Sequence, residues 1–493
     1  MIEDAKSFFY NYLHVILGKA IGSGAIQFVS LLLIVRILEP EGYGSYVLFT
    51  SVALIIAILT TWTSSSIVRF GREEFITEGS IRKTFWANYW ILLPAFVLCF
   101  LVILIFRARL TQYIDIPDNY CSLIFAYILL SNLSANIPIT FQAMGKMKHF
   151  SYLPLVFSFS FLLALAVIYF KSFSVPVELI IGLLILGHLL TALIGLWLLR
   201  KDITPVCFPR DWIRKCLSYS WPMALGGASQ QVVQNVDQMV IRMFMALAFV
   251  GIYNVAYQMQ TYLIMVPLLS ASLMFPLMTS LIVTREEDKI GQYIKLYAPQ
   301  IAFSWALTVS VFLVFAPEIF WLFGPNYAGA SFAFTILLLC IAFRIIPIIE
   351  SPALSSYGLI KQAVSISVAI GVINLGLDFL LIPAMGISGA AVATTVAFVA
   401  GALGRTFILR RELGINNFKC YPWLFPVIVT FIGSVFIDGL VPRALFLLMV
   451  ILVSLLVAKR SAVFNSESLV ILDSIDMPAF LRQTIKKVYS LVV

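Results

Sequence analysis

Polar side chains that could bind a ligand or an ion are concentrated in an otherwise apolar stretch, residues 217–258. Seven of them occupy two neighbouring stripes of one helix: Gln231, Asn235, Gln238 and Arg242 at i, i+4, i+7 and i+11, with Gln230, Gln234 and Asp237 beside them. Amides hydrogen-bond hydroxyl groups, a guanidinium binds anions, and a carboxyl group binds protons or cations. Ionisable groups inside a bilayer are costly and usually face a protein interior or a watery cavity. This helix is therefore predicted to line a cavity.

The composition indicates a membrane protein. Hydrophobic residues make up 61% of the 493 residues, charged residues only 12%, and the mean hydropathy is +0.99. A soluble domain is about half apolar and a quarter charged, so the chain is predicted to cross a membrane many times. The net charge of +9 is attributed to Lys and Arg in cytoplasmic loops, not to a nucleic-acid surface. The six cysteines show no CxxC or CxxH spacing, so no metal site is predicted.

The predicted fold is an all-α polytopic membrane protein with fourteen apolar segments long enough to span a bilayer. They are expected near residues 12–37, 46–68, 86–106, 121–142, 151–170, 177–199, 217–244, 251–281, 296–320, 331–352, 362–383, 387–409, 422–438 and 441–458. Lys and Arg gather in alternate loops. This asymmetry puts both termini in the cytoplasm, because cytoplasmic loops carry the excess of basic residues.

The first twelve spans fall into two groups of six, and a basic segment containing proline separates them. The predicted organisation is an N-terminal lobe at 1–200, a basic cytoplasmic linker at 201–216, a C-terminal lobe at 217–412, two additional helices at 413–460 and a tail at 461–493. The tail fits either a short amphipathic helix on the cytoplasmic membrane surface or a disordered segment.

The two groups share a weak internal repeat. The junctions after the first and seventh spans, residues 37–49 and 245–257, are similar when Gly42 is aligned with Gly251. Two six-span halves with matching junctions suggest a parallel repeat and a transporter.

Three stretches resemble a known family. VRILEPEGYGSYVLFT (35–50) and GGASQQVVQNVDQMVIRMFMALAFVGIYNVAYQM (226–259) are similar to junction signatures of polysaccharide and oligosaccharide-lipid flippases. LFGPNYAGA (322–330), followed by residues 358–398, is similar to the run from the ninth-to-tenth-span loop into the twelfth span of those proteins. Over roughly residues 10–412 the chain resembles the multidrug/oligosaccharidyl-lipid/polysaccharide (MOP) superfamily, and especially Wzx-type O-antigen and capsule repeat-unit flippases.

This resemblance implies two six-helix lobes around a central cavity that opens to one membrane face at a time. It also implies a substrate of undecaprenyl diphosphate carrying a short glycan, moved from the inner to the outer leaflet of the bacterial cytoplasmic (inner) membrane. The expected partners are membrane lipids and, on the basic loops, polysaccharide polymerase or assembly proteins. A monomer is expected because each half completes the other. The resemblance does not identify the glycan.

Such a substrate requires positive charge for its diphosphate and amides for its sugar hydroxyls. Lys19 lies in the first span and Arg242 in the seventh, and these spans are equivalent in the two halves; Arg344 lies inside an apolar run. These three, together with Arg36, are the predicted diphosphate contacts. The predicted glycan contacts all carry amides: Gln27, Gln230, Gln231, Gln234, Asn235 and Gln238.

Structural roles compete with these assignments. Arg36 lies near a span end, where snorkelling to phosphate headgroups is equally reasonable. Any single amide could instead hydrogen-bond a neighbouring helix, contributing roughly 1 kcal/mol. Asp237 and Arg242 are about 140° apart around a helix, which makes a direct pair poor.

The acids at membrane depth are candidates for coupling transport to an ion gradient. Asp237 and Asp378 are the predicted coupling groups or charge partners, whereas Glu350, near a cytoplasmic helix end, is expected to be solvated. No cofactor is predicted. Coupling to an H+ gradient, a Na+ gradient or the membrane potential stays open.

The sequence predicts a transporter and not an enzyme, because it has no GxxxxGK[ST] loop and no acid–base or nucleophile constellation. Two alternatives remain within the superfamily: a lipid II flippase and a cation-coupled multidrug exporter. The interiors of the N-terminal spans contain Lys19 and no Asp or Glu, which favours an anionic substrate over the exporter. A lipid II flippase shares the fourteen-span plan and the basic cavity, so only substrate data separate it.

Overall fold

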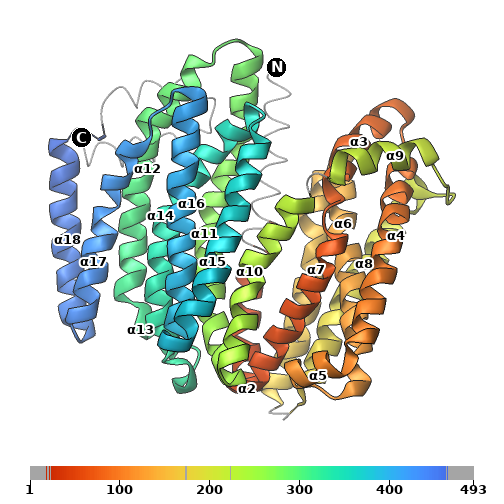
Figure 1. Cartoon of the computed structure of the whole chain (residues 1–493), viewed down its shortest axis with the longest axis horizontal. Coiled ribbons are helices and arrows are strands. Elements are labelled where there is room, and N and C mark those ends of the chain that lie inside the picture. Colours follow the sequence, from red (N-terminus) through yellow and green to blue (C-terminus); the bar gives the residue numbers. More distant parts are fainter. Residues whose placement is uncertain are drawn as a thin grey trace. The chain divides into compact units, whose positions relative to one another are not determined.

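The protein is described by a computed structural model that covers residues 24–171, 175–221 and 224–461, with Gly18, Gly22, Val463 and Phe464. Over these residues the chain forms helices and no strand, and eleven helices are long and apolar enough to cross a membrane (Figure 1). The predicted all-α membrane fold is confirmed. The predicted tail helix lies outside the described residues.

The contacts within the chain divide it into two units. Unit 1 comprises Met1–Gln258, Leu322–Ala330 and Gly371–Ala390, and unit 2 comprises Met259–Trp321, Ser331–Ile370 and Ala391–Val493. These units reflect which elements pack together, whereas the predicted lobes follow the order of the spans. The lobe boundaries stay a prediction.

Unit 1 contains most of the N-terminal helices. They are α2 (Gly24–Ile56), η2 (Ala57–Thr60), α3 (Ser64–Glu78), α4 (Arg82–Ile105), α5 (Arg107–Ile114), η3 (Asp118–Tyr120), α6 (Ser122–Ala143), α7 (Met147–Phe170), α8 (Val177–Ile203), α9 (Arg210–Ser220), α10 (Ala224–Phe244) and η5 (Pro325–Tyr327). Three helices contribute to both units: α11 (Leu247–Val283), α15 (Ile360–Met385) and α16 (Ile387–Leu413).

The remaining helices belong to unit 2. They are α12 (Asp288–Val314), α13 (Ala316–Trp321), α14 (Ala330–Ser356), η6 (Phe418–Leu424), α17 (Phe425–Phe436) and α18 (Leu440–Arg460).

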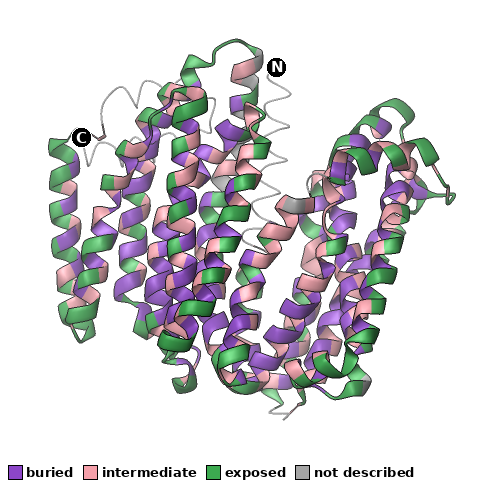
Figure 2. Cartoon of the chain, in the orientation of Figure 1, coloured by how far each residue is buried: buried purple, intermediate pink, exposed green. Residues whose placement is uncertain are grey.

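The buried and exposed residues of these helices fit a lipid environment. Purple buried residues and green exposed residues lie on different faces of the same helices in Figure 2. On α4 the exposed residues include Leu93, Val97 and Leu104, which are apolar. Lipid would cover such side chains in a membrane, so apolar groups are needed on the outward face as well as the inward one.

Two breaks interrupt the helices near the N-terminus. Within α2, Glu39 adopts the left-handed region (φ 54°) before Pro40, which separates the predicted first and second spans. The second predicted span, near 46–68, covers the end of α2, η2 and the start of α3. The chain leaves α-helix at η2, where Asn132 Nδ2 donates to the Thr60 carbonyl oxygen at 2.9 Å. A side chain from α6 therefore satisfies backbone that the break exposes.

The predicted linker contains a helix that is docked on unit 1. Helix α9 packs against α3 and α4, and the Trp212 indole donates to Thr84 Oγ1 at 2.7 Å. Lys215 Nζ lies 2.6 Å from Glu73 Oε1, and Cys216 is fully buried. Burial raises the pKa of the Cys216 thiol to about 11. The predicted seventh span, 217–244, is accordingly two helices, with α9 ending at Ser220 and α10 beginning at Ala224.

The two junctions of the predicted repeat contact each other within unit 1. A Cβ atom on Gly44 would overlap the Leu247 carbonyl oxygen, and one on Gly251 would overlap the Pro40 carbonyl oxygen. Beside them, the Tyr43 hydroxyl donates to Asn254 Oδ1 at 2.8 Å. Glycine at these positions therefore permits the close approach of two backbones.

Candidate functional site

The amide-bearing face of α10 is open on one side and packed on the other. Gln230 and Gln234 are exposed, whereas Asn235 and Gln238 are buried. Asn235 Nδ2 donates to the Gln231 carbonyl oxygen at 2.9 Å and to Gln231 Oε1 at 3.2 Å. The predicted glycan contacts on α10 thus divide into two exposed glutamines, the bonded pair Gln231 and Asn235, and Gln238, whose Oε1 is buried with no hydrogen-bond partner among the described residues.

Helix α2 packs beside α10 and adds Gln27, which is also exposed. Exposed amides on two adjacent helices can bind sugar hydroxyl groups if water reaches this surface. If lipid covered the surface instead, each amide would incur an uncompensated desolvation cost.

The structure brings two predicted acids together. Asp237 on α10 is 1% exposed and Asp378 on α15 is fully buried, and their carboxyl groups interact through a side-chain hydrogen bond. The Tyr253 hydroxyl donates to Asp237 Oδ2, and Asn374 Nδ2 donates to Asp378 Oδ2 at 3.3 Å. Two carboxyl groups can share a hydrogen bond only if one of them carries a proton, and a bound cation could take that proton's place. This carboxyl pair is therefore able to take up a positive charge.

Arg242 is only partly available to a ligand. Its Nε donates to the Tyr113 carbonyl oxygen at 3.2 Å, and the Tyr113 hydroxyl donates to the Met239 carbonyl oxygen. These bonds join the end of α10 to α5. Asp237 bonds Tyr253 and Asp378, so the poor geometry expected for a direct Asp237–Arg242 pair is consistent with the separate partners of the two residues.

Arg36 is exposed and joins three segments of unit 1. Its Nη1 donates to the Tyr169 hydroxyl at 3.4 Å, and its Nη2 donates to the Leu322 carbonyl oxygen at 2.7 Å. These contacts give Arg36 a structural role in addition to the predicted diphosphate binding. Lys19, the other predicted diphosphate contact of the first span, lies outside the described residues.

Arg344 belongs to unit 2, on α14. Its guanidinium carbon lies 4.2 Å from the ring centre of Phe398 on α16. Among the described residues Arg344 has no ion pair. Its positive charge repels that of the nearby Arg405. A cation at membrane depth without a counter-ion is a candidate anion site.

The neighbouring Glu350 is not solvated, so that expectation is wrong. Glu350 is fully buried, and it accepts hydrogen bonds from Thr406 Oγ1 and from Asn417 Nδ2, each at 2.8 Å. Arg405 lies within electrostatic range of it and donates to Ser351 Oγ at 2.6 Å. Residues after α16 fold over the carboxyl group, which sequence position alone does not reveal.

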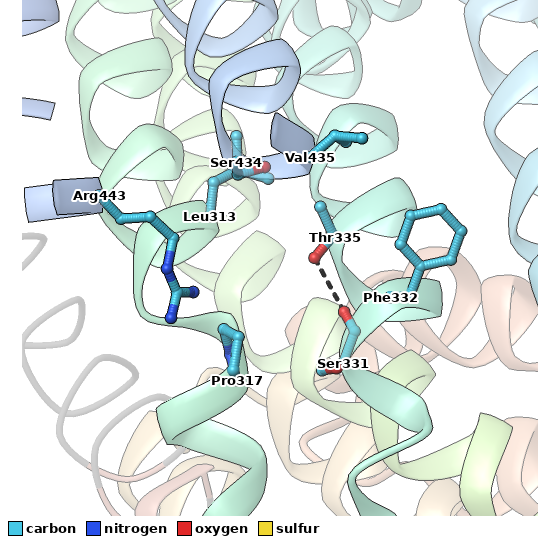
Figure 3. A pocket seen from close by; sticks show the side chains of 8 residues that line it. All are labelled: Leu313, Pro317, Ser331, Phe332, Thr335, Ser434, Val435 and Arg443. Carbon is cyan, nitrogen blue, oxygen red and sulfur yellow. Dashed lines mark hydrogen bonds between the residues drawn. The ribbon is translucent and has the colours of Figure 1, made fainter. Parts of the chain in front are cut away.

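A cavity of about 190 Å³ in unit 2 contains none of the predicted site residues (Figure 3). Its lining is mixed: Leu313, Pro317, Ser331, Phe332, Thr335, Ser434, Val435 and Arg443. The basic member, Arg443, donates to Glu318 Oε1 at 2.9 Å and to the Val314 carbonyl oxygen at 3.0 Å. Arg443 is thus a paired arginine, in contrast to Arg344.

Comparison with known proteins identifies the family. The family described as "Polysaccharide biosynthesis protein" matches residues 10–282, which is more than half of the chain. The chain belongs to this polysaccharide biosynthesis protein family.

Two proteins of Haloferax volcanii are similar to this polysaccharide biosynthesis protein. "Probable flippase AglR" is 24% identical over 195 residues, which cover 38% of this chain and 37% of that relative. "Probable low-salt glycan biosynthesis flippase Agl15" is 25% identical over 399 residues, which cover 78% of this chain and 80% of that relative. The match thus spans just over a third of the first relative's length and most of the second's.

The fold is shared with a solved transporter. The inward-facing conformation of a multidrug resistance MATE family transporter of the MOP superfamily matches with a TM-score of 0.63 at 18% identity, covering 83% of this chain and 99% of that one. The predicted MOP-type fold is confirmed for this polysaccharide biosynthesis protein.

Proposed function

We propose that this polysaccharide biosynthesis protein is a flippase for a lipid-linked oligosaccharide. In this proposal it moves an undecaprenyl-diphosphate-linked repeat unit, of the O-antigen, capsule or exopolysaccharide type, from the inner to the outer leaflet of the bacterial cytoplasmic membrane by alternating access. The family match and the flippase names of the two Haloferax relatives support a glycan flippase. The identity of the lipid carrier and the type of glycan are proposed beyond what these relatives support.

The observation that carries it is the exposed amide surface of α10 and α2. Gln27 is exposed on α2, which is apolar and long enough to cross a membrane, and Gln230 and Gln234 are exposed on the neighbouring α10. A membrane protein retains such groups where water and a polar ligand reach them. A glycan offers many hydroxyl groups, each able to donate to an amide oxygen and accept from an amide nitrogen.

Cationic side chains would bind the diphosphate. Arg344 supports this role best, because it lacks an ion pair among the described residues. Arg242 keeps its two terminal nitrogens for a ligand while its Nε holds the Tyr113 carbonyl oxygen. Lys19 enters the proposal from its sequence position, and Arg36 is the weakest candidate because its bonds to Tyr169 and Leu322 already use both terminal nitrogens.

The Asp237–Asp378 pair is the proposed coupling site. Its hydrogen bond requires one proton, and a monovalent cation would satisfy the same oxygens. Uptake of a proton or Na+ would change the charge at the centre of α10, the helix that also carries the exposed amides. Transport could therefore use an ion gradient without ATP hydrolysis by this chain.

A lipid II flippase and a cation-coupled multidrug exporter are the alternatives. The exposed amides favour a glycan-bearing substrate over a typical apolar drug cation. Lipid II also carries a diphosphate and sugars, so the choice between it and a repeat unit depends on the substrate transported.

The test is complementation of a strain that lacks its own repeat-unit flippase. Lys19→Ala and Arg242→Ala, alone and combined, are expected to abolish surface polysaccharide while the protein still inserts and lipid-linked repeat units accumulate. The matched control is Lys459→Ala with Arg460→Ala, two exposed basic residues at the end of α18. Normal export by the Lys19/Arg242 double variant would refute their diphosphate role. Failure of the unmodified chain to restore export, with rescue of a lipid II flippase mutant instead, would support the lipid II alternative.

A further inference from the structure

One rim of unit 1 carries aromatic and basic side chains that the proposed transport function does not use. It begins where an apolar stripe on α8 ends. Leu186, Leu190, Leu193 and Trp197 are all exposed, and they recur at i, i+4, i+7 and i+11. Arg200 continues the stripe one turn later, with its guanidinium carbon 4.8 Å from the Trp197 ring centre. The stripe changes from aliphatic to aromatic to basic, which is the order met on passing from lipid tails to headgroups.

Helix α4 shows the same order from its opposite terminus. Trp90, Leu93, Val97, Leu101 and Leu104 are exposed at i, i+3, i+7, i+11 and i+14. Tryptophan is enriched at the membrane–water boundary, where its ring packs among lipids while its N–H finds a polar partner. Trp90 and Trp197 therefore mark one boundary level on two helices.

The segment between α8 and α9 is held against these helices at that level. The Trp86 indole donates to the Ile203 carbonyl oxygen at 2.7 Å, and the Trp90 indole donates to the Cys207 carbonyl oxygen at 3.0 Å. The Phe208 and Trp90 rings pack edge to face, with centres 5.4 Å apart. The backbone of this segment is thus anchored by side chains of α4.

On this anchored backbone, apolar side chains face outward. Val206 is 62% exposed and Phe208 is 65% exposed, and the segment between α8 and α9 is coloured largely as exposed in Figure 2. Arg210, also exposed, begins α9 directly after them. Exposed apolar residues next to a cation suit a surface that meets both acyl chains and phosphate groups.

The segment between α8 and α9 and the residues next to it carry a net positive charge. Asp202 is paired with Lys146 at 2.9 Å, so its charge is already matched. Arg200, Lys201 and Arg210 are the basic residues of this segment, Arg82 and Lys83 act electrostatically on Cys207 within it, and the acids nearby are Asp211 and Glu74. A positive surface at the cytoplasmic boundary attracts anionic lipids, because the cytoplasmic leaflet carries a negative surface potential.

We propose that this rim is a binding surface for anionic phospholipid headgroups of the cytoplasmic leaflet. We call it the interfacial collar, and it consists of Trp90, Trp197, Arg200, Val206, Phe208 and Arg210. The arginines would hold the phosphates, and Val206 and Phe208 would enter the upper acyl region. Lipid is favoured over a protein partner because the collar is continuous with the two lipid-facing stripes on α4 and α8. The collar would fix the depth of unit 1 in the membrane, and this role does not depend on which glycan is transported.

The test measures lipid retained by the purified full-length chain. The protein is placed in nanodiscs of mixed phosphatidylcholine and phosphatidylglycerol, and native mass spectrometry then counts each lipid that stays bound. Arg200→Gln with Arg210→Gln is expected to weaken phosphatidylglycerol retention by roughly 25-fold, since each of the two basic residues at an anionic surface contributes roughly fivefold. Lys459→Gln with Arg460→Gln removes the same charge from α18 and is expected to leave retention by the collar unchanged.

Several results would overturn the proposal. Unchanged phosphatidylglycerol retention by the Arg200/Arg210 double variant would do so. Equal loss in Arg200→Lys with Arg210→Lys would also do so, because lysine keeps the charge that recruits the headgroup. If the Gln double variant kept its lipid yet lost glycan export in cells, the collar would serve a cytoplasmic protein and not lipid. Retention that also falls in Val206→Ser with Phe208→Ser would support the acyl contact. The lipid-retention readouts do not require the flippase assignment to hold.

Discussion

Two buried carboxyl sites in this protein differ in how their charge is satisfied. In unit 2, Glu350 is surrounded by donors: Thr406 and Asn417 hydrogen-bond it, and the cation Arg405 is near. In unit 1, Asp378 faces another acid, Asp237, and the nearby Tyr253 and Asn374 each donate to one carboxyl group.

We propose that this difference separates a structural acid, Glu350, from a functional pair, Asp237 and Asp378. Glu350 has hydrogen-bond donors on two other segments, so it holds α14, α16 and the residues just before η6 together. The Asp237–Asp378 pair cannot carry two negative charges at hydrogen-bond distance without a proton or cation. Such a site changes state when the ion changes, which is what coupling to a gradient requires.

The largest expected effect comes from neutralising the pair. Asp378→Asn keeps the shape and a hydrogen bond to Asp237 but removes the exchangeable charge. Ion-coupled transport is expected to fall about 1,000-fold, equivalent to about 4 kcal/mol, while the melting temperature of the purified protein is kept. Transport rates in proteoliposomes with an imposed H+ or Na+ gradient give the measurement. Full gradient-driven transport by this variant would remove the distinction between the two sites.

Glu350→Ala is expected to act on stability and not on coupling. It leaves Asn417 Nδ2 and Thr406 Oγ1 buried without their acceptor, at a cost of roughly 2–3 kcal/mol. Thermal unfolding in detergent measures the loss, and Thr406→Val, which removes one donor, should lose roughly 1 kcal/mol. Transport per folded molecule should be retained. A stable Glu350→Ala protein that has lost ion coupling would reverse the roles assigned to the two acids.

Arg344 and Arg443 in unit 2 allow the same comparison for cations, between a side chain without an ion pair and one that is paired. Arg344 has no ion pair among the described residues, whereas Arg443 is bound to Glu318 and the Val314 carbonyl oxygen. Arg344→Gln is expected to weaken substrate binding by roughly tenfold, about 1.4 kcal/mol, with unfolding unchanged. Arg443→Gln should lower stability and leave binding unchanged. Titration with a labelled polyprenyl-diphosphate glycan measures the binding affinity of each variant, and thermal unfolding measures its stability. Equal losses of affinity in the two variants would contradict a specific role for Arg344.

The smallest effect is expected from the amides. Gln230→Ala with Gln234→Ala should reduce glycan affinity roughly fivefold, because each removes a hydrogen bond worth about 0.5–1 kcal/mol net. Gln112→Ala with Gln292→Ala, exposed glutamines on α5 and α12, is the matched control. The same binding titration applies. A similar loss in the control pair would mean that the α10 amides are not specific contacts.

The parts of the fold that follow from hydropathy could be predicted from sequence. Most apolar runs lie within helices of the structure, although the runs at 46–68 and 217–244 each cover more than one helix. The cavity-lining role of the polar stripe on α10 stays a prediction. The carboxyl pair was only half predicted. Asp237 and Asp378 were singled out separately, but their approach joins helices far apart in sequence, and no periodicity reports that. Asn374, four residues before Asp378, was a local signal for one of its partners.

Other features depended on tertiary contacts that the sequence hides. The apolar character of residues 46–68 conceals the break at η2, because Asn132 on α6 supplies the compensating bond. Helix α9 was hidden in a basic, proline-containing segment, since its stability comes from Trp212, Lys215 and Cys216 packing on α3 and α4. Glu350 was misjudged because Asn417 lies far beyond it in the chain.

The central claim is that this chain moves a lipid-linked glycan between leaflets. The most direct measurement uses proteoliposomes containing a fluorescent undecaprenyl-diphosphate oligosaccharide and a membrane-impermeant quencher. With the unmodified protein, the probe in the inner leaflet is expected to become accessible, so quenching proceeds past the outer-leaflet fraction toward completion. Vesicles with the Lys19→Ala/Arg242→Ala variant should stop at the outer-leaflet fraction, as empty vesicles do. Quenching by the unmodified protein that stops at that same fraction, with inserted and folded protein, would contradict the account.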